Sequence, residues 1–221
     1  MQKRRGQIGP RFIIFMFGLL FMSLGTVFLI LADLGPLPWD VLHVGLYYRF
    51  GLTIGTWNII TGILVLTTAA ILMKSIPQFG AFINMIMFGV FVDMYLLLPF
   101  MVTPSSLLGK MIMFAFGLVI CCYGMGIYIS AGLGAGPRDS LMLAITSKTG
   151  WRIGKVRNVI EVIVLIIGWQ LGGPVFWGTI VVSVTIGSIA SYALPQCQKL
   201  TDIILDKFKK KEIETTFYQI K

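Results

Sequence analysis

Long apolar stretches without charge alternate along this chain with short segments rich in Gly, Pro and charged residues. A helix needs about 20 consecutive apolar residues to cross the hydrocarbon core of a bilayer. Stretches of this kind recur along nearly the whole sequence, so we predict an all-α polytopic membrane protein with about six transmembrane helices. The expected spans are residues 11–31, 56–73, 80–100, 111–130, 156–171 and 175–194.

The two halves of the chain share one pattern, which indicates an internal duplication. The motif Leu-Gly-x-x-Pro-x-Asp occurs at residues 34–40 and again at 133–139, a spacing of 99 positions. Glycines before and after the motif repeat at the same spacing, and two later pairs repeat at a spacing of 98. We therefore expect two transmembrane repeats, residues 11–100 and 110–195. The matching pairs are Gly18/Gly117, Gly25/Gly124 and Gly51/Gly150, then Gly80/Gly178 and Gly89/Gly187.

A short helix is expected directly after the first span of each repeat, at about residues 38–50 and 137–149. Pro38 and Pro137 suit a first helical turn, where the missing N–H has no partner to lose. Gly51 and Gly150 suit the position just beyond a helix end. About 12 residues at 1.5 Å each span about 18 Å, which is too short for a core of about 30 Å. Each repeat is thus expected to contain a re-entrant half-helix.

Charge is scarce and follows the expected topology. Charged residues make up 12% of the chain, about half the share found in soluble domains. With six spans and the N-terminus inside, only Arg49 and Lys110 among the 18 Lys and Arg residues fall outside, as the positive-inside rule requires. Both termini are then inside, and three spans per repeat invert the second copy relative to the first. Eight spans with parallel repeats would leave the same number of Lys and Arg residues inside. Charge therefore cannot distinguish the two topologies, and the short length of the two half-helices favours six spans.

The terminal segments carry most of the remaining basic residues. Residues 1–10 form a basic N-terminal segment, and residues 196–221 form a basic tail with apolar residues interleaved. Such a tail is typical of an amphipathic helix attracted to anionic lipid. The net charge of +9 is spread between the spans, so we expect the lipid bilayer as a partner and no nucleic acid.

Inverted repeats with broken helices recur in secondary transporters, with the binding site near the membrane midplane between the repeats. Irregular backbone at membrane depth is tolerated only where protein buries it or a wet cavity adjoins it. Helix N-termini at that depth offer free N–H groups and partial positive charge to an anion or a carbonyl oxygen. An alternative is that both Asp residues only cap their own helices. The candidate substrate-binding residues are Gly35, Pro38, Asp40, Gly134, Pro137, Arg138 and Asp139.

Charges within the spans are costly and are therefore candidates for coupling transport to an ion. Asp93 and Glu161 are the acids embedded in spans, and a carrier that moves protons needs a carboxylate of this kind. Arg157 lies four residues before Glu161, so these two could instead simply pair along one helix face.

The function classes left are those of a membrane protein without a cofactor. The chain has no Gly-x-x-x-x-Gly-Lys-Ser/Thr phosphate loop and no His-Glu-x-x-His zinc motif. Its three cysteines and its single histidine, His43, lack metal-ligand spacing, and we read His43 as a polar residue near a membrane interface. We expect a secondary transporter or channel for a polar or anionic small molecule, a possible homodimer, and no enzyme. The alternative is a membrane scaffold that recruits a cytoplasmic partner through its basic tail.

The segment 132–143, followed by Gly150-Trp151-Arg152-Ile153-Gly154, resembles the YczE/YitT-like group of bacterial integral membrane proteins. The similarity continues through Arg157, Glu161 and residues 168–173, and it covers residues 11–194. This resemblance implies a bacterial cytoplasmic membrane protein of a largely uncharacterised group of proposed transporters. The first repeat departs from the pattern, because Trp39 stands where the second repeat has Arg138. A role for that arginine therefore belongs to one repeat only.

Overall fold

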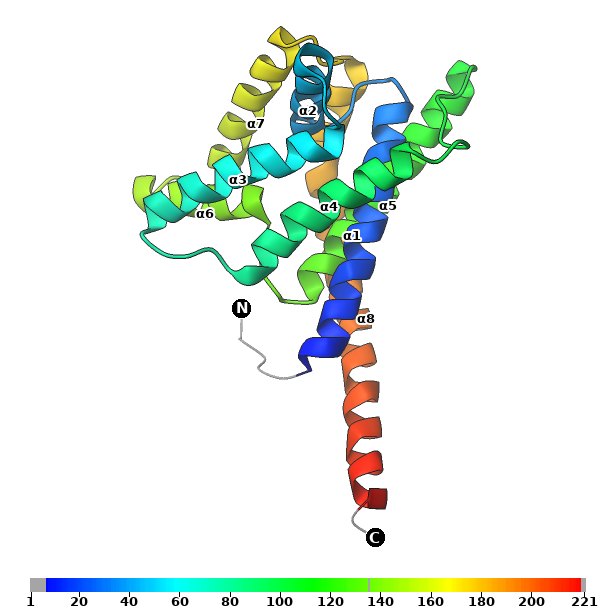
Figure 1. Cartoon of the computed structure of the whole chain (residues 1–221), viewed down its shortest axis with the longest axis vertical. Coiled ribbons are helices and arrows are strands. Elements are labelled where there is room, and N and C mark those ends of the chain that lie inside the picture. Colours follow the sequence, from blue (N-terminus) through cyan, green and yellow to red (C-terminus); the bar gives the residue numbers. More distant parts are fainter. Residues whose placement is uncertain (1–6, 135, 220–221) are drawn as a thin grey trace.

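The computed structural model describes residues 7–134 and 136–219, with side chains described as far as residue 208 (Figure 1). Within these residues the chain forms eight α-helices and no strand. The helices are α1 (Ile8–Leu31), α2 (Pro38–Phe50), α3 (Ile54–Met73), α4 (Phe79–Leu96), α5 (Leu107–Ser130), α6 (Pro137–Thr149), α7 (Ile153–Gln170) and α8 (Trp177–Gln219).

Five helices of the described chain are long and apolar enough to cross a membrane: α1, α3, α4, α5 and the part of α8 up to Phe208. The prediction of an all-helical multi-pass membrane protein is thereby confirmed. The remaining expected span, residues 156–171, corresponds to α7, which has 18 residues and carries Lys155, Arg157 and Glu161. The other five each contain an apolar stretch of 18 residues with at most two charges, whereas the 18 residues of α7 include three.

The two short helices, α2 and α6, begin and end at the predicted residues. Each has 13 residues and starts with a proline, so each is only about 20 Å long. Gly51 and Gly150 follow them with φ of 75° and 70°. L-residues avoid this left-handed region, so a glycine is the natural terminator at both ends.

Helices α1 and α5 cross at the centre of the molecule and run in opposite directions (Figure 1). Their backbones approach so closely at Gly18 and Gly25 that an added Cβ would overlap Tyr128 and Cys121. The same crossing is repeated at Gly117 beside Leu29 and at Gly124 beside Met22. Each contact in the first pair becomes a contact in the second when 99 is added to the residue number on α1 and subtracted from the residue number on α5. Equivalent residues of the two halves therefore make the same contacts.

The short helix of each half packs against a helix of the other half. Helix α2 packs against α7, and α6 packs against α3. The turn at Leu34 contacts Gly178 at the start of α8, and the equivalent turn at Leu133 contacts Gly80 at the start of α4. Residues 11–100 and 110–195 are therefore intertwined within one body rather than two separate domains.

One contact within the first half has no counterpart in the second. Helix α3 packs on α4 where Gly55 meets Gly89, and Asp93 accepts hydrogen bonds there from the Gly55 N–H at 2.7 Å and the Thr53 hydroxyl at 2.5 Å. The equivalent glycines are Gly154 of α7 and Gly187 of α8. Among the described residues, neither has another segment within 4 Å of the position that a Cβ would take.

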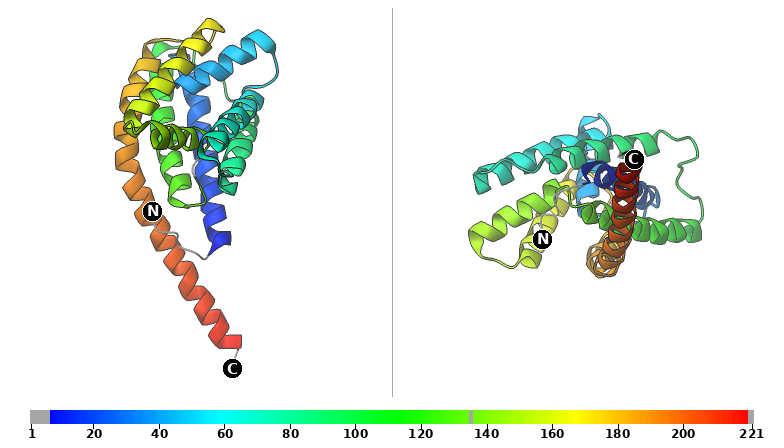
Figure 2. Two further views of the ribbon diagram at one scale, coloured as in Figure 1. Left: turned by 90° about the vertical axis from the view of Figure 1, so that its left-hand side faces the viewer. Right: turned by 90° about the horizontal axis from the view of Figure 1, so that it is seen from below.

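Helix α8 continues through Pro195 instead of giving way to a separate tail helix at residue 196 (Figure 2). The first part of the expected tail belongs to the bundle, because Thr201 and Leu205 are buried. Thr201 is 2.6 Å from the Ser130 hydroxyl at the end of α5. A proline removes one hydrogen bond from a helix interior, and these contacts hold the helix together beyond that point. The segment beyond residue 208 lies outside the residues whose side chains are described.

Candidate functional site

The N-terminal ends of α2 and α6 open onto one cavity between the two halves of the chain. Its volume is about 100 Å³, enough for several water molecules, since one needs about 10–15 Å³ on this measure. Leu37 and Pro38 line it from the first half, and the equivalent Gly136 and Pro137 line it from the second. Both helix starts lack a capping side chain. Further lining groups come from α3, α4, α5 and α7.

Two residues at equivalent positions in the repeats meet at this cavity. The Arg138 guanidinium lies 5.0 Å from the centre of the Trp39 ring, within the range of a cation–π interaction. Its Nη2 is also 3.7 Å from Oδ1 of Asp40, close enough for an ion pair but too long for a hydrogen bond. Arg138 is one-quarter exposed and lines the cavity, whereas Asp40 is buried behind it.

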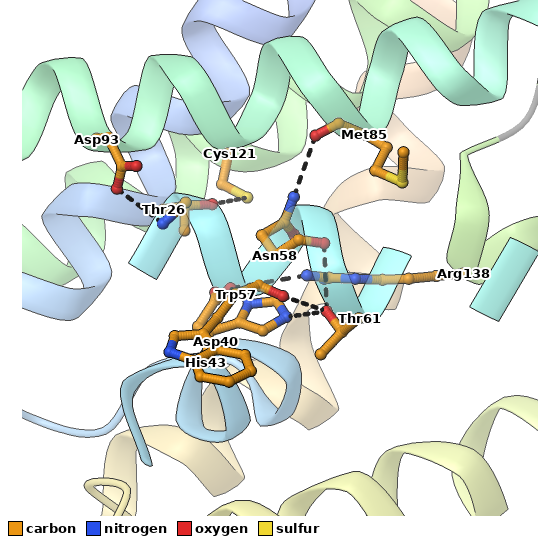
Figure 3. Close-up of polar contacts among 11 residues, drawn as sticks. Thr26, Asp40, His43, Trp57, Asn58, Thr61, Met85, Asp93, Cys121 and Arg138 are labelled. Atoms are coloured by element: carbon orange, nitrogen blue, oxygen red, sulfur yellow. Dashed lines mark hydrogen bonds and ion pairs between the residues drawn. The ribbon is translucent and has the colours of Figure 1, made fainter. Parts of the chain in front are cut away.

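His43 connects Asp40 to the cavity wall on α3 (Figure 3). Its Nδ1 is 3.9 Å from Oδ1 of Asp40, and its Nε2 is 2.9 Å from the Thr61 hydroxyl. Thr61 in turn donates to the Trp57 carbonyl of its own helix at 2.8 Å and lines the cavity. His43 is therefore a buried residue that lines the cavity, which the sequence did not predict.

A second arginine and two more carboxylates also line the cavity. Arg157 donates from Nε to Oε1 of Glu161 at 2.8 Å, so these residues form the pair expected from their spacing along α7. The Tyr128 hydroxyl donates to Oδ2 of Asp139 at 3.4 Å. All four side chains line the cavity.

Several buried polar atoms around the cavity lack a hydrogen-bond partner among the described residues. They are Nδ2 of Asn84, Nε1 of Trp39 and Oδ2 of Asp40. Asn84 and Trp39 are more than nine-tenths buried and line the cavity. A buried polar group without a partner costs about 1–3 kcal/mol, so these groups are suited to a bound molecule or to water.

The comparisons with known proteins address the family. A family model described as "Family of unknown function (DUF6198)" matches residues 9–195. The chain belongs to this family.

The chain is similar to three proteins whose names assign no activity. The chain is 43% identical over 185 residues to "Uncharacterized membrane protein YczE" of Bacillus subtilis strain 168, which covers 83% of this chain and 85% of that protein. It is 32% identical over 164 residues to "Uncharacterized protein YyaS" of the same organism, covering 74% and 82%. It is 29% identical over 197 residues to an "Uncharacterized protein" of Haemophilus influenzae, covering 88% of each. The resemblance to YczE-like proteins is thereby confirmed. No solved structure matches the chain.

The structure gathers most of the predicted site residues of this DUF6198 chain but separates three of them. Pro38, Pro137, Arg138, Asp139, Arg157 and Glu161 line the cavity, and Asp40 lies directly behind Arg138.

The three separated residues have structural contacts elsewhere. Gly35 packs on Thr179 and Gly134 on Gln78, where they fix the turns and do not line the cavity. Asp93 binds the start of α3 instead of facing the cavity. No local pattern could predict this contact, because Asp93 and its partner Gly55 lie 38 positions apart.

Sequence reasoning did not assign Trp39, His43, Thr61 or Tyr128 to the site. Trp39 could have been found from the duplication, since it stands opposite Arg138. His43 lies one helical turn after Asp40, which places both on one face of α2. Within the described residues, no group of three or more His, Cys, Asp or Glu side chains could hold a metal ion.

Proposed function

We propose that this protein is a small secondary transporter or channel for a polar or anionic small molecule, with its binding site at the cavity between the ends of α2 and α6. The observation that carries the proposal is that the uncapped N-termini of both short helices face one cavity, which two arginines and unpartnered polar groups also line. Helix N-termini and arginines favour negatively charged or carbonyl oxygens. Polar groups of this kind within a membrane protein usually mark a substrate pathway.

The topology in this proposal has six spans in two inverted repeats, with α2 and α6 re-entrant and both termini on the cytoplasmic side of a bacterial inner membrane. The antiparallel crossing of α1 and α5 supports inversion, because equivalent helices of parallel repeats would run in the same direction. The reciprocal glycine contacts support a pseudo-twofold axis between the repeats. The length of α2 and α6, about 20 Å, supports re-entry. No ATP-binding motif is present in the sequence, so the solute gradient or a coupled ion would drive transport.

Flux through purified protein in proteoliposomes, screened over small anions, amino acids and sugars, tests this function. Arg138→Ala and Asp139→Ala should each lower flux at least tenfold while the protein still folds, because both residues line the cavity. The matched controls are Arg152→Ala and Asp206→Ala, which remove the same charges from exposed positions away from the cavity. Equal flux in all four variants would exclude this cavity as the transport site, and absence of flux from wild-type protein for every solute class would count against transport.

A second candidate function is a membrane scaffold that binds a cytoplasmic partner. The observation that favours it is the length of α8, whose 43 residues extend well beyond the other helices (Figure 1). The end of that helix carries the lysines at positions 207 and 209–211. A chain ending at Phe208 separates the two functions, because it keeps the cavity and loses most of this basic segment. Loss of function in this variant would favour the scaffold.

A further inference from the structure

We propose that the transported molecule carries a small carboxylate, that this carboxylate takes Arg138 from Asp40, and that Asp40 then binds a proton. This inference rests on the proposed function and adds the substrate class and the coupled ion. Arg138 is the positive group for which the substrate carboxylate and the Asp40 carboxylate compete. It contacts the cavity on one side and buried Asp40 on the other.

The geometry leaves the Arg138 donors available to a ligand. A guanidinium has five N–H donors and binds a carboxylate best through two parallel hydrogen bonds. The distance of 3.7 Å to Asp40 is longer than a hydrogen bond, so Asp40 uses only the charge of Arg138. An incoming carboxylate offers the same chemistry at hydrogen-bond distance. Asn84 supplies a further unpartnered donor on the cavity wall.

Losing Arg138 would leave Asp40 as a buried charge without a partner. That state costs several kcal/mol, and a buried group avoids it by becoming neutral. The proton comes from a hydronium ion that enters the cavity. His43 lies between Thr61 and Asp40, but its Nδ1 is 3.9 Å from Oδ1 of Asp40, which is too long for direct proton transfer. One anion and one proton thus enter together. An O–H bond of the hydronium ion breaks as the O–H bond on Asp40 forms, which leaves neutral water.

Other charged and titratable groups lie near Asp40 or around the cavity. His43 is on its own helix, Arg138 and Asp139 are on α6, and Cys121 and Tyr128 are on α5. Arg157 and Glu161 face the cavity from α7 and are paired with each other. Asp40 is distinguished by full burial together with an arginine that a ligand can reach.

Proton uptake on addition of sodium acetate tests the coupling. The protein, in nanodiscs and weakly buffered near pH 7, is titrated while a pH indicator reports protons and calorimetry reports binding. We expect about one proton per acetate bound, by linkage. Asp40→Asn should bind acetate without proton uptake, and Arg138→Gln should lose both signals. The control Asp206→Asn, at an exposed position away from the cavity, should keep both.

Three outcomes would overturn the coupling. Acetate binding without proton uptake in wild-type protein would exclude the proton, and uptake that persists in Asp40→Asn would assign it to another group. Absence of acetate binding at tens of millimolar would exclude the carboxylate. Each of these results can occur while solute flux persists, so failure here is distinguishable from failure of the transport proposal.

A second inference comes from a difference between two helix pairs. Helices α3 and α4 pack closely at Gly55 and Gly89, whereas α7 and α8 do not pack closely at the equivalent glycines. We infer that the two helix pairs are alternating gates, and that this structure has the α3–α4 gate closed and the α7–α8 gate open. This inference also rests on the proposed function. Gly55 and Gly89 bring α3 and α4 together, and Asp93 holds them by bonding to Thr53 and Gly55. The equivalent Gly154 and Gly187 have the small size that close packing needs, yet they are apart here.

Exchanging the conformations of the two repeats would close α7 on α8 and open α3 from α4. Such an exchange is the expected mode of alternating access around a fixed site between inverted repeats. It would leave the α1–α5 crossing in place, because that contact is the same in both halves. Asp93 has no acidic counterpart, since Ser191 occupies the equivalent position, so the α3–α4 gate should be the more stable one.

Cysteine cross-linking in a Cys-free background tests the gates without any ligand. The first pair is Ile59→Cys with Met85→Cys, whose native side chains belong to one apolar cluster between α3 and α4. The second is the equivalent pair, Asn158→Cys with Ser183→Cys on α7 and α8. The first pair should cross-link readily and the second slowly. Gly55→Leu should then slow the first and speed the second several-fold, because a side chain at Gly55 would overlap Gly89 and Asp93.

Gly154→Leu is the matched control and should have the opposite effect, since it blocks the gate that is open in this structure. If the second pair never cross-links, or if Gly55→Leu leaves both rates unchanged, the alternating gates are excluded. If the cross-linking rates of the two pairs change as expected but no solute flux is found, the gates stand and the transport proposal is rejected. The two proposals therefore fail separately.

Discussion

At the scale of single residues, some equivalent positions of the two halves carry the same residue and others carry different residues. The glycines of the α1–α5 crossing are repeated in kind, and their contacts are reciprocal. Trp39 and Arg138 occupy equivalent positions but differ, and the structure brings them into contact. Repeated residues thus form the framework of the molecule, and the residues that differ give the cavity its charge.

Gly18→Ala should destabilise the protein by about 1–3 kcal/mol, the usual cost of overfilling a packed contact. The new Cβ would overlap the Tyr128 backbone on α5. The measurement is thermal unfolding in detergent. Gly9→Ala is the control in the same helix, because it has open space around it and alanine favours the helix. An equal loss of stability in both variants would contradict the close α1–α5 packing.

The sequence predicted the cavity residues that lie next to the turn motif, because the motif itself placed Pro38, Pro137, Arg138 and Asp139 at helix starts. It could not place Asp93, whose burial against Gly55 depends on how α3 folds back on α4. It also placed His43 at a membrane interface. The burial of His43 follows from the packing of α2 against α7, which no local pattern reveals.

At the scale of elements, local signals determined helix ends well. Proline at the start and glycine at the end predicted the bounds of α2 and α6 at the observed residues. Pro195 misled us, because a proline can continue a helix where neighbouring contacts compensate for the lost hydrogen bond. In α8 those contacts come from Thr201 and Leu205, both buried against the bundle.

Truncation of α8 should therefore depend on where the chain ends. A chain ending at Phe208 should keep the unfolding temperature of the full protein, because the removed residues lie beyond Thr201 and Leu205. A chain ending at Gln198 loses both and should unfold about 2–8 °C lower, as expected for about 1–2 kcal/mol in a chain of this size. Thermal unfolding of the two truncations side by side decides this, and equal unfolding temperatures would show that residues 199–208 do not stabilise the bundle.

At the scale of the whole molecule, the halves hold each other through exchanged elements. The α2–α7 and α3–α6 contacts and the two turn contacts at Gly80 and Gly178 all join residues of different repeats. The sequence revealed that there are two copies but not how they interlock, since chain order alone does not determine long-range packing. The cavity lies where the interlocked halves meet, which is why both half-helices reach it.

Opposite orientation of the repeats is the claim on which the shared site depends, and labelling of equivalent helix ends tests it most directly. Single cysteines replace Phe50 and Thr149, the exposed last residues of α2 and α6, in a Cys-free protein in intact cells. Inverted repeats predict that a membrane-impermeant maleimide labels the cysteine at position 50 from outside, and the cysteine at position 149 only after the cells are permeabilised. Labelling of both cysteines from the same side of the membrane would contradict inversion and, with it, the shared site between inverted repeats.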